Sequence, residues 1–174
     1  MVFNLKVTSN KRGQMKMSFG MIFSIFLIIF FLIFAFYGIK KFMTISDVAQ
    51  LNKFKDQVIE DVDKLWKGSQ GSQTVQYSVP SGIQKICFID YGSGQHGRNS
   101  LLYTELRNSY LELENIFFYP RGASEGFDSF ELKHLNLEES VAEENPLCFD
   151  NEDGKVSWRI EKDFGESVVR ITKP

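Results

Sequence analysis

The residues best placed to do chemistry form a glycine-rich segment, Gly92-Ser93-Gly94-Gln95-His96-Gly97. It matches the pattern G-x-G-x-x-G, whose glycines let backbone amides approach a pyrophosphate at the N-terminus of a helix. The segment also lies between a strand-like and a helix-like stretch. However, the surrounding chain is too short for a doubly wound nucleotide-binding domain and carries hairpin signals instead. We therefore interpret residues 92–97 as a mobile loop and expect no cofactor.

Two further groups of residues were candidates for metal binding. The acidic turn Asp150-Asn151-Glu152-Asp153-Gly154 offers the oxygen ligands that calcium prefers, but it lacks the downstream glutamate of an EF-hand. Turn formation alone accounts for its composition. The two histidines, His96 and His134, lie on unlike elements with no further ligands at zinc spacing. The sequence predicts no metal site.

No nucleophile lies in a catalytic setting. The chain has no serine in a G-x-S-x-G turn, and neither Cys87 nor Cys148 has a protease-type neighbourhood. The glutamate pairs 138–139 and 143–144 are expected to form a solvated acidic face. The sequence therefore predicts that the protein is not an enzyme.

The elements that hold these residues begin with a long apolar run. Residues 17–39, MSFGMIFSIFLIIFFLIFAFYGI, carry no charge. At 1.5 Å per residue such a helix reaches about 34 Å, more than a hydrocarbon core of about 30 Å. The run is too long for a cleaved secretory signal and has no good small-x-small cleavage site. It predicts a single transmembrane helix, with the lipid bilayer as its partner.

Charge suggests the orientation of that helix. The tail, residues 1–16, carries four basic residues and no acid, whereas residues 40–174 hold the other 16 bases and all 22 acids. Four lysines also follow the span closely, at positions 40, 41, 53 and 55. The numbers of basic residues on the two sides are therefore nearly equal, and the positive-inside rule alone favours neither orientation strongly. The compact basic cluster favours a cytoplasmic N-terminus and a C-terminal head outside. The acidic excess of the rest argues against a nucleic-acid partner.

The two cysteines bear on the same question. Cys87 and Cys148 both lie in strand-like apolar settings, 61 residues apart. A disulfide closing that loop would contribute on the order of 4 kcal/mol. It would need an oxidising compartment, which agrees with a head outside the cell. The alternative is two buried free thiols.

Residues 40–67 predict an amphipathic stalk helix ended by Gly68. It either continues the transmembrane helix or starts again at a cap formed by Thr44 or Ser46. Its apolar stripe is expected to pack on the protein's own soluble domain, and a parallel coiled coil is the alternative. The stripe consists of Val48, Leu51, Val58, Ile59, Val62, Leu65 and Trp66.

The remaining chain predicts a polar linker, residues 68–74, and a soluble head, residues 75–174. Hydrophobic periodicity and turn residues predict strands over 75–79, 83–91, 115–119 and 127–137 and a helix over 100–113. Strands over 147–149 and 156–160 flank the acidic turn as a hairpin, and a third strand over 167–172 completes a C-terminal antiparallel meander. The expected fold class is α+β: a long N-terminal helix followed by a small β-rich head.

The N-terminal residues Lys11-Arg12-Gly13-Gln14, followed by the apolar helix, resemble the processing site of archaeal type IV pilin-like precursors with class III signal peptides. A hydrophobic helix, an amphipathic continuation and a β-rich head are also similar to the pilin layout. The resemblance implies cleavage between Gly13 and Gln14, insertion with the N-terminus inside, and assembly through residues 18–39. Where that family commonly has Ser and Glu, this chain has Lys16 and Ser18.

Two functions follow as expectations. The first is a membrane-anchored, non-enzymatic surface protein of pilin-like architecture, which assembles or binds partners through its extracytoplasmic head. The alternative is an unprocessed bitopic adaptor or accessory subunit of a membrane complex. In either case self-association or contact with a membrane-protein partner is expected through residues 18–39, at the cell membrane.

Overall fold

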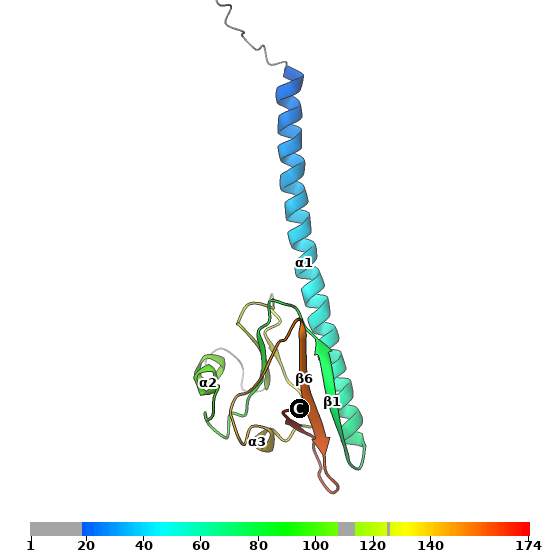
Figure 1. Ribbon diagram of the computed structural model, residues 1–174, viewed down its shortest axis with the longest axis vertical. Coiled ribbons are helices and arrows are strands. Elements are labelled where there is room, and N and C mark those ends of the chain that lie inside the picture. Colours follow the sequence, from blue (N-terminus) through cyan, green and yellow to red (C-terminus); the bar gives the residue numbers. More distant parts are fainter. Residues whose placement is uncertain (1–18, 108–113, 125) are drawn as a thin grey trace, which may run out of the picture. The chain divides into compact units, whose positions relative to one another are not determined.

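A computed structural model of the chain describes residues 19–107, 114–124 and 126–174. It confirms the predicted α+β layout, with one long N-terminal helix followed by antiparallel sheets and short helices (Figure 1). The chain forms two compact units, Met1–Lys41 and Phe42–Pro174. The second unit contains both sheets and is called the head below.

Helix α1 spans Phe19–Lys67 without a break, so neither Thr44 nor Ser46 starts a second helix. The amide of Gly68 donates to the carbonyl of Leu65 at 3.0 Å where the helix ends. Strand β1 then begins at Gly71. The predicted linker over 68–74 is therefore too long, because its last four residues pair with another strand.

The head contains two antiparallel sheets. The first has three strands in the order β1-β6-β7, and the second has four in the order β4-β3-β2-β5. Their bounds are β1 Gly71–Ser78, β2 Lys85–Phe88, β3 Ile116–Tyr119, β4 Ser129–Phe130, β5 Leu147–Asp150, β6 Lys155–Lys162 and β7 Arg170–Thr172. Two short helices, α2 Ser100–Arg107 and α3 Leu137–Ser140, complete the described part.

The predicted hairpin across the acidic turn is wrong. Strand β5 pairs with β2, and β6 pairs with β1 along eight consecutive residues, so the turn carries the chain from one sheet to the other. Only β6 and β7 remain of the predicted meander. The side-chain amide of Asn151 donates to the carbonyls of Pro80 and Ile83, which ties the turn to a distant segment. Longer-range pairing therefore outweighed the local reversal.

Two other predicted boundaries changed. The segment 127–137 forms only the two-residue strand β4, and its last residue opens helix α3. The side chain of Asn136 caps that helix by accepting from the amide of Glu139 at 3.1 Å. Helix α2 covers the first part of the predicted 100–113 helix, and residues 108–113 lie outside the described part of the chain.

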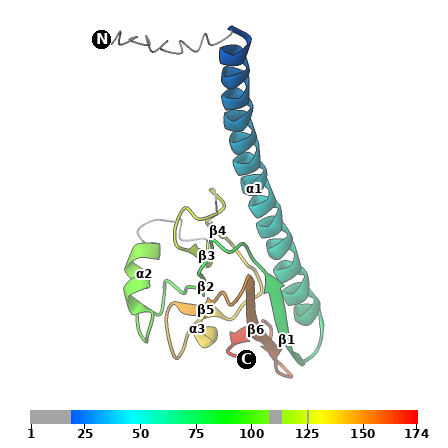
Figure 2. The same ribbon diagram turned by 45° about the horizontal axis from the view of Figure 1, so that its top comes forward.

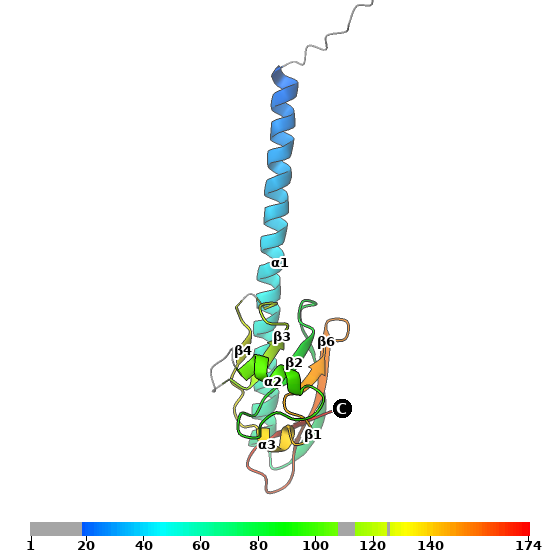
Figure 3. The ribbon, with the colours of Figure 1, turned by 90° about the vertical axis from the view of Figure 1, so that its left-hand side faces the viewer.

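The four-stranded sheet is buried on both faces. Ile86 and Phe88 face the main core, whereas Cys87 and Ile89 face a smaller cluster under Tyr103 of α2. This alternation follows from the two-residue period of a strand. Within the head, residues 42–67 of α1 and helix α2 lie on opposite sides of this sheet (Figures 2 and 3).

The centre of the main core is Phe54 of α1, which is fully buried. Its ring lies 5.5–6.3 Å from four aromatic rings in edge-to-face geometry, those of Tyr77, Phe118, Phe130 and Trp158. Leu51, Val58 and Val62 are also fully buried on the same helix. The predicted stripe thus packs on the protein's own sheets, and the predicted stalk is a core helix of the head.

Candidate functional site

The most conspicuous surface of the chain is the N-terminal part of α1. All described residues from 19 to 41 are exposed. Twenty large apolar side chains between Phe19 and Ile45 are 41–83% exposed. The hydroxyl of Ser24 donates to the carbonyl of Gly20 at 2.8 Å, which satisfies it within the helix. By length and composition the helix is able to cross a membrane.

The residues of the predicted processing site, Gly13 and Gln14, lie outside the described residues, as do Lys16 and the first two residues of the predicted span. Processing therefore stays a prediction from the sequence.

The structure joins the two cysteines. Cys87 of β2 and Cys148 of β5 are directly opposite each other in the sheet, and their sulfur atoms form a disulfide. Cys87 is fully buried and Cys148 is 8% exposed, beneath Tyr103 and Leu106 of α2. The bond connects two neighbouring strands that are 61 residues apart in the chain.

The glycine-rich loop is bound to a buried asparagine. The side chain of Asn145 accepts from the amide of Asp90 and donates to the carbonyls of Asp90 and Gly94, at 2.6–3.2 Å. The backbones of His96 and Asn145 pair as well. A side chain at Gly97 would lie 2.4 Å from Cβ of Glu144. Packing of the loop thus accounts for its last glycine without a phosphate ligand.

The candidate metal ligands are engaged separately. His96 contacts the carbonyl of Val141 through Nε2 at 2.9 Å, whereas the ring of His134 stacks on Trp66 at 3.7 Å. Asp150 pairs with Lys85. Over residues 19–107, 114–124 and 126–174 no group of three or more His, Cys, Asp or Glu side chains could hold a metal ion.

The predicted solvated acidic face is only partly correct. Glu138 and Glu143 are exposed, but Glu144 is 5% exposed and pairs with Lys173 at 2.6 Å. Glu139 pairs with Arg170 at 3.6 Å. The acidic segment therefore contributes to two ion pairs with the C-terminal strand and tail.

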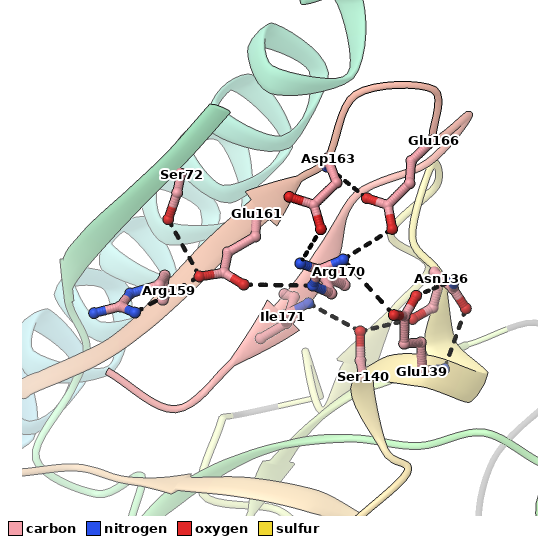
Figure 4. A network of polar contacts seen from close by, with 10 residues as sticks. All are labelled: Ser72, Asn136, Glu139, Ser140, Arg159, Glu161, Asp163, Glu166, Arg170 and Ile171. Atoms are coloured by element: carbon pink, nitrogen blue, oxygen red, sulfur yellow. Dashed lines mark hydrogen bonds and ion pairs between the residues drawn. The ribbon is translucent and has the colours of Figure 1, made fainter. Parts of the chain in front are cut away.

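Arg170 is the centre of a polar network that the sequence analysis missed (Figure 4). Its guanidinium is paired with four carboxylates and its side chain is 19% exposed. The hydrogen bond to Asp163 raises the pKa of Arg170, so the guanidinium keeps its charge. The carboxylates belong to Asp163 at 2.6 Å, Glu166 at 2.8 Å, Glu161 at 3.4 Å and Glu139 at 3.6 Å.

The network shapes the turn between β6 and β7. The amide of Asp163 donates to the carboxylate of Glu166 at 2.6 Å, and the amide of Glu166 donates back to the carbonyl of Asp163 at 3.1 Å. The turn presents Phe164, which is 81% exposed. It lies at the C-terminal end of α1, because Nε1 of Trp66 donates to the carbonyl of Ser167 at 3.0 Å. The sequence signal was an arginine with acids four, seven and nine residues before it.

No known protein family, curated protein or solved structure matches this chain. The functional argument therefore depends on the chain's own residues. The surface that stands out chemically is the exposed apolar part of α1, and the head is a unit with a disulfide and its own hydrophobic core.

Proposed function

We propose that this protein is a membrane-anchored, non-enzymatic surface protein, with its N-terminus in the cytoplasm and its head outside the cell. The observation that carries the proposal is the exposed apolar surface of α1. A fully exposed side chain of this kind gains about 1.5–3 kcal/mol when it is removed from water. For twenty of them, each 41–83% exposed, the total still exceeds the roughly 5–15 kcal/mol that stabilises a typical domain. A lipid bilayer removes this surface from water.

Two features support the orientation. The basic tail before the span favours the cytoplasmic side by the positive-inside rule. The disulfide between Cys87 and Cys148 belongs in an oxidising compartment. Both features support a head on the outer side.

A binding role, rather than catalysis, is supported by the structural contacts that the candidate chemical groups make within the head. Asn145 holds the glycine-rich loop, and His134 stacks on Trp66. Phe164 is exposed on the turn between β6 and β7, which is held by the contacts of Asp163 and Glu166 and lies beside the C-terminal end of α1. Its ring offers an apolar contact for a protein partner. Aromatic side chains on rigid supports are typical anchors of protein interfaces.

The pilin-like plan is part of the proposal. Its support is a continuous helix α1 whose later half, with Phe54, packs into a β-rich head. Cleavage between Gly13 and Gln14 would shorten the mature chain, which intact-mass measurement of the purified protein detects. A mature chain that keeps Met1 would favour the unprocessed adaptor instead.

Thiol labelling tests location and orientation together. Intact cells are treated with a membrane-impermeant maleimide before and after mild reduction. We expect labelling of Cys87 and Cys148 only after reduction, with the protein remaining in the membrane pellet through alkaline extraction. Labelling that needs lysis but no reductant would place the head in the cytoplasm and end the surface-protein proposal.

A further inference from the structure

Three exposed apolar side chains lie within the head unit, just before its core begins. Phe42, Met43 and Ile45 are 72%, 59% and 57% exposed. The first fully buried residue of α1 is Leu51. Lys40 and Lys41 directly precede them, so apolar surface resumes after the charged pair that ends the predicted span.

Helix geometry places two of these side chains away from the head core. An α-helix turns about 100° per residue, so Phe42 and Ile45 lie about 165° and 135° from the centre of the core-facing residues Leu51, Phe54, Val58 and Val62. Met43 points within about 20° of the direction of Phe54, but it lies about two helical turns before Leu51, where the buried stretch begins, and stays exposed. The head's own core therefore leaves all three side chains uncovered.

Phe42 and Met43 lie at the depth of the headgroup region of a bilayer, and Ile45 lies at its outer edge. Phe42 and Ile45 are about 4.5 and 9 Å beyond Ile39 along the helix, at 1.5 Å per residue. The headgroup region on each side of the hydrocarbon core is about 5–8 Å thick. Helix faces that carry Phe or aliphatic side chains beside lysines bind at this boundary, where the ammonium groups reach anionic headgroups.

We propose that Phe42, Met43 and Ile45 form a collar that binds the headgroup region of the bilayer and holds the head at the membrane surface. This inference rests on the proposed membrane anchoring of α1. The occupant is lipid because the collar continues the apolar surface of the span and because Lys40 and Lys41 complement anionic headgroups. Only five residues separate Ile45 from Leu51, about 9 Å of helix from one to the other, so no free stalk intervenes.

Nitroxide scanning of the full-length protein tests the collar. Because both native cysteines are bonded, a single introduced cysteine takes the label. The variants are F42C in the collar, F30C within the span and D56C, an exposed control on the same helix face two heptads later. Each is reconstituted in phosphatidylcholine–phosphatidylglycerol vesicles, and its relative accessibility to oxygen and to a water-soluble nickel chelate is measured.

We expect the oxygen-to-nickel ratio at position 42 to be several-fold above that at position 56 and below that at position 30. Equal ratios at positions 42 and 56 would overturn the collar while leaving the anchor intact. Spin–spin broadening at position 42 that vanishes on dilution with unlabelled protein would show a second copy there and also overturn it. A water-like ratio at position 30 would instead refute the membrane anchoring itself.

Discussion

Replacing Phe54 by alanine should destabilise the head more than any change on its surface. The side chain is fully buried and meets four aromatic rings edge-on. Large-to-small changes of a buried phenylalanine cost about 3–5 kcal/mol, because transfer energy is lost and a cavity remains. For a unit of about 130 residues the entropy of unfolding is about 0.28 kcal/mol per degree, so a loss of 4 kcal/mol lowers the Tm by about 14 °C.

The assay is thermal unfolding of the full chain in detergent, followed by near-ultraviolet circular dichroism. The matched control is F36A, which removes the same atoms from a residue of α1 that is 73% exposed. We expect its head Tm to be unchanged. Equal Tm values for F54A and F36A would refute the packing described here. A Tm that rises with protein concentration would indicate that the stripe packs between chains, as in a coiled coil.

Three further changes test other contacts. R170M should lower the free energy of unfolding by about 1–3 kcal/mol, because four carboxylates lose their shared partner. The control is R159M, because Arg159 is 43% exposed and forms one ion pair at 3.6 Å. Its free energy of unfolding, measured by urea titration, should stay within about 0.5 kcal/mol of the original. Burial raises the pKa of Tyr77 above its ordinary value of 10.0. The contribution of the protonated Tyr77 hydroxyl to the free energy of unfolding is therefore complete below pH 10 and falls as the pH rises beyond it. Y77F should flatten the alkaline arm of the stability–pH curve, and an unchanged arm would refute this. Reducing Cys87–Cys148 should lower stability by about 4 kcal/mol for its 61-residue loop, and denaturation midpoints equal with and without reductant would contradict that.

The sequence predicted the features that depend on neighbouring residues. The uncharged run before Lys40 indicates a membrane-length helix without any knowledge of the rest of the chain. Three-four spacing predicted the helix up to Lys67, and alternation predicted the inward face of β6 with Trp158. The even cysteine pair in strand-like settings suggested the disulfide. The helix and strand signals are each complete within a short segment, and the disulfide could be suggested because the chain has only two cysteines.

Only the tertiary structure decided which segments meet. The acidic turn at 150–154 reverses the chain locally, but β5 pairs with β2 along four residues and β6 pairs with β1 along eight. Phe54 lies off the predicted stripe, and its central role depends on rings from four strands, β1, β3, β4 and β6. The partners of Arg170 come from three elements. Such contacts depend on which of several distant segments packs into the same core. No local sequence pattern encodes the result of that competition.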